Sequence, residues 1–215
     1  MPKPMKIDFV SDISCPWCII GLRGLEEALV RTGELIAAEI TFQPFELNPG
    51  MGKDGQNIVE HVAEKYGSSP DESRANRQMI RDRAADLGFT MAMSDTSRIY
   101  NTFDAHRLLH WAQIEGKQAA LKHALFTAYF TDQQNPSDRE VLVAAAAEAG
   151  LDPARAAEIL ASDTYAPEVR AAEQLWHSRG ITAVPAVIID DRYLISGGQP
   201  PAAFEKALRE IAAEA

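Results

Sequence analysis

Two cysteines three positions apart, Cys15 and Cys18, constrain this chain more than any other feature. They follow a run of β-forming residues, 6–10, and open a segment whose apolar residues recur every three or four positions as far as Gly33. A Cys-x-x-Cys pair between a strand and a helix is typical of redox-active sites. The two intervening residues let both sulfurs meet in one small ring, and the helix dipole favours a thiolate at the first cysteine. We therefore predict that Cys15 is the attacking thiol and that the more buried Cys18 resolves the mixed disulfide.

Other uses of this cysteine pair have less support. A closed zinc site needs about four ligands, and His106 and His110, spaced to share one helix face, would have to complete it. Nothing else in the sequence supports such a site, so we expect no metal; two inert buried cysteines are the remaining alternative. Pro16 suits the first helical turn because it needs no N–H partner. Trp17 is expected either to shield the sulfurs and contact the substrate or to act as a spacer.

Strand signals are confined to the two ends of the chain. Besides 6–10 they cover 39–44, which Pro44 closes, and the pair 186–189 and 192–195. We predict no strand between about 47 and 165. The order is therefore βαβ, a long helical block and αββα, which places the chain in the α/β class.

Helical periodicity fills the middle and returns near the end of the chain. The predicted helices cover 70–88, 101–115, 118–130, 139–150, a short segment from 152, 167–179 and 204–211. Capping boxes at 69–72 and 137–140 are predicted to begin two of them.

Six short motifs extend this pattern along the chain: 8–9 (DF), 14–18 (SCPWC), 44–49 (PFELNP), 101–108 (NTFDAHRL), 180–185 (GITAVP) and 196–200 (SGGQP). With them the chain resembles the DsbA-like thioredoxin family, and more closely its FrnE-type cytosolic members. The resemblance implies a thioredoxin fold interrupted by a large all-helical insertion. Residues 1–50 and 166–215 would form the thioredoxin-like domain, and 51–165 the inserted helical domain. It also implies dithiol oxidase or disulfide isomerase activity without a prosthetic group.

The resemblance also assigns roles to individual residues. Cys15 and Cys18 correspond to the redox pair, and Pro185 to the proline that is cis in thioredoxin folds. A cis Val184–Pro185 bond would leave neighbouring backbone groups free to pair with an extended substrate. We therefore predict that Val184 and Pro185, with Pro16 and Trp17, contact the substrate. Periplasmic DsbA proteins have a histidine between the cysteines where this chain has Trp17, which argues against a strongly oxidising enzyme.

Two other functions remain open. The 2-hydroxychromene-2-carboxylate isomerases and kappa-type glutathione transferases share the fold and activate glutathione with a serine at the position of Cys15. Ser14 is adjacent, so glutathione stays an alternative co-substrate. A peptide-binding chaperone module is the non-enzymatic alternative, with Met79, Met91 and Met93 lining an apolar groove.

Charge and hydropathy exclude several partners. The formal net charge of −10 disfavours nucleic acid. No stretch approaches the roughly 20 apolar residues of a membrane span, and the first residues carry no signal core, so we expect a cytoplasmic protein. Its expected partners are protein or peptide thiols and disulfides, and related folds suggest a homodimer.

Overall fold

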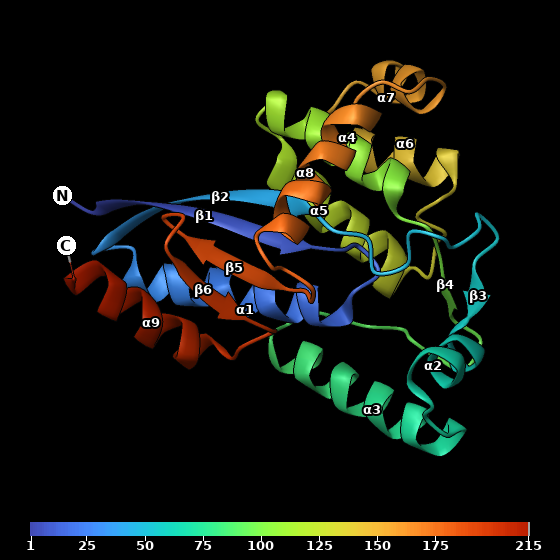
Figure 1. The fold of residues 1–215 in the computed structure, drawn as a ribbon, viewed down its shortest axis with the longest axis horizontal. Helices are drawn as coiled ribbons and strands as arrows, with labels where there is room; N and C mark the ends of the chain where they lie inside the picture. Colours follow the sequence, from blue (N-terminus) through green and yellow to red (C-terminus); the bar gives the residue numbers. More distant parts are fainter. Residues whose placement is uncertain (215) are drawn as a thin grey trace.

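The computed structural model describes residues 1–214 and is built around a four-stranded mixed sheet (Figure 1). Its strands lie in the order β2-β1-β5-β6, with β1 and β2 parallel and the other pairs antiparallel. Their bounds are β1 (Lys3–Ser11), β2 (Ile36–Pro44), β5 (Ala186–Ile189) and β6 (Tyr193–Ser196). The central strand β1 is continuously buried from residue 7 to 11, as expected for a strand covered on both faces. β1 leads into residues 12–15, which we call the redox loop and which end at Cys15.

Two faces of the sheet are covered by different helices. On one face α1 (Pro16–Thr32) and α9 (Pro201–Ala213) pack on each other and on the sheet. On the other, Trp176 of α8 (Ala166–Ser178) packs with Val10 of β1 and Ile188 of β5. The alternation of side chains along β1 assigns Phe9 to the first face and Val10 to the second. The two chain ends lie near each other, since Lys3 Nζ reaches the carbonyl of Ile211 at 3.4 Å.

The segment between β2 and α8 is mostly helical. It contains β3 (Gln56–Asn57), α2 (Ile58–Tyr66), α3 (Pro70–Asp86), β4 (Arg98–Ile99), α4 (Phe103–Ile114), α5 (Gln118–Phe126), the π-helical turn η1 (Thr127–Thr131), α6 (Arg139–Glu148) and α7 (Pro153–Leu160). In Figure 1, α2 and α3 lie below the level of the sheet, and α4, α6 and α7 lie above it. None of the helices within residues 1–214 combines the length and apolar character that crossing a membrane requires.

The edge of the sheet at β2 is closed by a side chain of this segment. Gln118, the first residue of α5, accepts a hydrogen bond from Phe42 N and donates one to Phe42 O, both at 2.9 Å. The amide therefore pairs with β2 as a neighbouring strand would. This contact fixes α5 against the sheet.

Three sequence predictions require correction. The region 47–165 contains a strand pair, β3 and β4, which is only two residues long and too short to show alternation. The helix predicted over 118–130 widens into the π-helical turn η1, where Asp132 N donates to Thr127 O. The second capping box is absent: Asp138 caps α6 by accepting from Glu140 N and Val141 N, and Ser137 donates to Asn101 O instead.

Candidate active site

The two cysteines occupy the end of β1 and the start of α1. Cys15 is the N-cap residue of α1, and Pro16 follows at the first helical position. Both cysteines are free thiols; Cys15 is 3% exposed and Cys18 is fully buried. Cys18 N donates to Cys15 O at 3.0 Å, which holds the pair within one turn. The first sulfur thus lies at the positive end of the helix dipole, with the second one behind it.

Pro185, the predicted cis proline, follows a residue that contacts the Cys15 sulfur. The Val184–Pro185 bond is cis, and Cys15 Sγ donates to Val184 O at 3.7 Å. Pro185 is buried against Gly21 of α1, where a Cβ would come within 3.1 Å of Pro185 Cγ. The structure therefore brings Cys15, Cys18, Val184 and Pro185 together from sequence positions 170 apart.

Trp17 is half-buried at the edge of this site. The guanidinium of Arg83 from α3 lies 5.3 Å from its ring centre, a cation–π distance. Gly198, before α9, packs so closely that a Cβ there would lie 2.8 Å from Trp17 O. Trp17 therefore contacts α3 and the segment before α9.

Asp12, which the sequence analysis overlooked, organises the redox loop. Its buried carboxylate accepts from Ser14 Oγ at 3.0 Å, Leu47 N at 2.7 Å and Thr102 Oγ1 at 2.7 Å. His106 Nε2 lies 3.4 Å from the carboxylate, without hydrogen-bond alignment. Burial acts to raise the pKa of Asp12, but the contacts with His106, Leu47 and Thr102 outweigh it and lower the pKa. The sequence feature that could have indicated this role is an acidic residue three positions before Cys15.

A second overlooked residue is Lys122 of α5, which is fully buried. Burial raises the pKa of Cys18 well above its usual range; a hydrogen bond that the Cys18 thiol makes to Cys15 adds to this, whereas the charge of Lys122 and a backbone hydrogen bond with Asp12 lower it. A lysine inside a helical pattern gave no sequence signal, because lysine is a common surface residue of helices.

The other residues considered in the sequence analysis are two histidines, His106 and His110, and three methionines. His106 contacts Asp12, whereas the ring of His110 stacks on Tyr165 at 5.0 Å. Within residues 1–214 no three His, Cys, Asp or Glu side chains are arranged to hold a metal ion. Met91 and Met93 are buried in the core, whereas Met79 is exposed, so the three methionines do not share one surface.

Comparison with known proteins agrees with this geometry. A profile of the DSBA-like thioredoxin domain matches residues 6–209. The chain belongs to this family. The uncharacterized protein YwbO of Bacillus subtilis (strain 168) is 29% identical over 207 residues, which make up 96% of each protein. The predicted thioredoxin fold with a helical insertion is thereby confirmed.

Three solved structures resemble this fold over nearly the whole chain. The probable DsbA oxidoreductase SCO1869 of Streptomyces coelicolor has a TM-score of 0.93 at 36% identity, covering 98% of this chain and 91% of that chain. The cytosolic disulfide reductase DsbM of Pseudomonas aeruginosa, solved with GSH, has a TM-score of 0.65 at 17% identity, covering 95% and 98%. A 2-hydroxychromene-2-carboxylate isomerase has a TM-score of 0.71 at 16% identity, covering 97% of each chain. At these identities the last two indicate a shared fold alone.

Proposed function

We propose that the chain is a thiol–disulfide oxidoreductase in which Cys15 exchanges disulfides with the substrate and Cys18 resolves the intermediate. The observation that carries this proposal is the place of the Cys15 sulfur, at the start of α1, with Val184 O in contact and Cys18 one turn behind. We expect the substrate sulfur to meet Cys15, which keeps 3% exposure, whereas Cys18 has none and would react only within the protein.

The exchange has two steps. The Cys15 thiolate attacks a substrate disulfide, so that one substrate sulfur leaves and the other stays bound to Cys15. The Cys18 sulfur then attacks Cys15 Sγ and releases the second substrate thiol. The reverse sequence oxidises a substrate dithiol. No further cofactor is required, because the two sulfurs carry both electrons.

The surface beside Trp17 supports a protein or peptide substrate. A hollow of about 300 Å³ lies between α1, α3 and the start of α9 and is lined largely by apolar groups, among them Ile20, Leu87, Pro200 and Pro201. Such a hollow would accept an apolar side chain adjacent to the reacting disulfide. We propose that Trp17, Val184 and Pro185 form the substrate-facing rim.

We further propose reduction or isomerisation in the cytoplasm as the net direction, in keeping with the FrnE-type resemblance. A cytosolic disulfide reductase shares the fold, and the cytosol holds exposed dithiol couples mainly reduced. We propose glutathione as the small co-substrate that reduces the Cys15–Cys18 disulfide and so returns the enzyme to its dithiol form.

The test is a redox titration. The purified protein is equilibrated in glutathione buffers, its thiols are trapped, and the fraction of Cys15–Cys18 disulfide is measured by mass, with Cys15→Ser as control. We expect one two-electron transition between about −270 and −120 mV, with no internal disulfide in the variant. Full disulfide exchange by Cys15→Ser, or a wild-type protein without any internal disulfide, would contradict the proposal.

The site does not support the two alternatives, a glutathione-dependent isomerase or transferase and a peptide-binding chaperone. The Ser14 hydroxyl donates to the buried carboxylate of Asp12, which does not favour a role in activating a glutathione thiol. The chaperone hypothesis is not favoured, because Met91 and Met93 belong to the core.

A further inference from the structure

His106 of α4 is a buried imidazole that faces a buried carboxylate. It is 2% exposed, Asp12 is 1% exposed, and His106 Nε2 lies 3.4 Å from Asp12 Oδ1. Within residues 1–214 this nitrogen has no hydrogen-bond partner, because its contact with Asp12 is not aligned as a hydrogen bond. The two groups therefore meet within ion-pair distance in the interior of the protein.

The geometry favours an ion pair over a contact between a neutral imidazole and the carboxylate. A neutral ring would direct either a misaligned N–H or the lone pair of Nε2 at the oxygen. An imidazolium attracts the carboxylate over 3.4 Å without requiring alignment. A buried carboxylate needs an opposite charge nearby. The hydrogen bonds to this carboxylate come from neutral donors of Ser14, Leu47 and Thr102.

The other buried carboxylates close to His106 already have a counter-ion. Glu46, which follows β2, and Glu173 of α8 both accept hydrogen bonds from Arg170. Burial raises the pKa of Glu46, and the charges of Arg170 and His106 act against this. Because Arg170 compensates both glutamates, Asp12 is the carboxylate for which His106 supplies the opposite charge.

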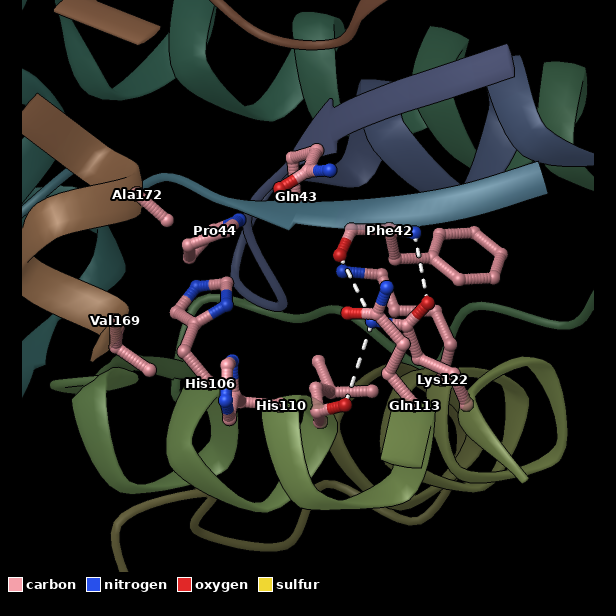
Figure 2. Close-up of a pocket in the computed structure, with 11 residues that line it drawn as sticks. Phe42, Gln43, Pro44, His106, His110, Gln113, Lys122, Val169 and Ala172 are labelled. Atoms are coloured by element: carbon pink, nitrogen blue, oxygen red, sulfur yellow. Dashed lines mark hydrogen bonds between the residues drawn. The ribbon is translucent and has the colours of Figure 1, made fainter. Parts of the chain in front are cut away.

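Two further titratable side chains lie around a small cavity beside His106. The cavity measures about 30 Å³, which is room for one water molecule, and His106, His110 and Lys122 of α5 line it. Figure 2 shows the ring of His106 directed from α4 toward Pro44 of β2. His110 stacks on Tyr165, with 5.0 Å between the ring centres. Of these two histidines, His106 is the one that lies against a carboxylate of the redox loop.

Asp12 connects this contact to the reacting cysteine. Its carboxylate accepts hydrogen bonds from Ser14 Oγ at 3.0 Å and Ser14 N at 3.4 Å, and its carbonyl accepts one from Cys15 N at 3.3 Å. Residues 12–15 therefore form a closed turn, whose first and last Cα atoms lie within about 7 Å of each other. The carboxylate fixes the backbone of this turn. Its negative charge also disfavours a nearby thiolate unless a cation compensates it.

We propose that His106 is a positioning residue of the exchange reaction: as an imidazolium it compensates the charge of Asp12 and keeps the redox loop in the state in which Cys15 reacts as a thiolate. This inference rests on the proposed function. His106 acts through Asp12 and takes no part in the bonds that form and break between sulfurs. Burial acts to raise the pKa of Asp12, and the contact with His106 is the largest of those that outweigh it, as such a pair requires.

The first test measures how readily Cys15 forms a thiolate. In a Cys18→Ser background, alkylation by iodoacetamide is followed by intact mass from pH 4 to 10, and the midpoint of the pH–rate profile is compared between variants. His106→Gln removes the charge and retains an N–H donor. His110→Gln is the matched control, because it makes the same change one turn later on the same helix and beside the same cavity.

We expect His106→Gln to raise the midpoint by about one pH unit and to slow alkylation below the midpoint about tenfold, because the uncompensated charge of Asp12 disfavours the thiolate. His110→Gln should leave the profile unchanged. In an Asp12→Asn background, His106→Gln should shift the midpoint by less than half as much, since the charge that it compensates is gone.

A second measurement needs no variant. Nitrogen NMR of the histidine side chains reports the charge of each imidazole, and His106 of the wild type should be an imidazolium at pH 7. This measurement tests the inference even if His106→Gln does not fold, which thermal unfolding verifies.

Four results would overturn the inference and leave the proposed function intact: an unchanged midpoint in His106→Gln, an equal shift in His110→Gln, an undiminished shift in the Asp12→Asn background, or a neutral His106 at pH 7. A wild-type protein that forms no Cys15–Cys18 disulfide in the glutathione titration would instead overturn the proposed function.

Discussion

Asp12 joins the redox loop to two distant parts of the chain. Its carboxylate accepts from Leu47 N, after β2, and from Thr102 Oγ1, before α4. An asparagine would present two N–H donors to a pocket that already contains donors, so at least one buried group would lose its partner. The loop that carries Cys15 therefore depends on a negative charge at this position.

We predict that Asp12→Asn lowers the free energy of unfolding by about 3 kcal/mol at pH 7. Because the folded-state pKa of Asp12 lies below its ordinary value of 3.8, the carboxylate stabilises the fold above that pH. This contribution is lost as the pH falls through the folded-state pKa. Urea unfolding at pH 7 and pH 3 measures the difference from wild type, which should shrink at pH 3. Asp54→Asn, at an exposed carboxylate, is the control and should change little; a similar effect in both variants would contradict the prediction.

The sequence could predict only part of this site. Cys15, Cys18 and Pro185 stand in local patterns, since a redox pair opens a helix and a proline precedes a strand. Asp12 does not, because its partners Leu47 and Thr102 lie 35 and 90 positions away in the sequence, and the burial of Lys122 is not signalled by the residues around it. Proximity of that kind follows from how α4 and α5 pack on the sheet, which no local periodicity encodes.

The approach of the segment before α9 to the start of α1 depends on the lack of a side chain at Gly198. A Cβ at this position would lie 2.8 Å from Trp17 O and 3.3 Å from the Trp17 ring. Backbone atoms cannot move away as a flexible side chain would. The glycine therefore determines how close α9 comes to the redox residues.

We predict that Gly198→Ala lowers the free energy of unfolding by about 1–3 kcal/mol and slows the reaction of Cys15 with oxidised glutathione, because Trp17 must shift. Chemical denaturation and the adduct assay measure the two effects. Gly52→Ala is the matched control, since no atom lies within 4 Å of a Cβ there. A stability for Gly198→Ala as close to wild type as that of Gly52→Ala would show that the contact is unimportant.

Among the helices and strands, the sequence predicted those features that depend on interactions between residues close together in the chain. The capping box of Ser69 and Glu72 is present, and α3 begins after it. The capping box expected at Ser137 failed because the charged Asp138 is the stronger acceptor for free N–H groups. The pair β3 and β4 could not be predicted, because two residues carry no periodicity and their pairing is decided by the fold around them.

Across the whole molecule, one apolar cluster joins the redox unit to the helical segment. It contains Phe9 and Cys18 beside the sheet together with Leu108 of α4 and Phe126 of α5. Side chains shared in this way lose their contacts together when either part opens. The cluster therefore makes the two parts energetically dependent on each other.

We predict one cooperative unfolding transition. Tryptophan fluorescence, which reports on Trp17 in the redox site, Trp111 in α4 and Trp176 in α8, should change together with far-ultraviolet circular dichroism. Leu108→Ala, at a fully buried position, should lower the midpoint by an amount equivalent to about 2–5 kcal/mol and keep the two signals coincident. Two separate transitions, or a Leu108→Ala transition in which only one signal shifts, would contradict a single cooperative unit.

Because Thr102 and His106 place the start of α4 against Asp12 of the redox loop, the helical segment contributes directly to the surroundings of the redox cysteines. Enzymes that keep the same Cys-Pro-Trp-Cys loop could diverge in reactivity through changes in the inserted segment alone. A chimera that exchanges this segment between two relatives would then transfer the reactivity of the donor, although both cysteines and every residue between them stay the same.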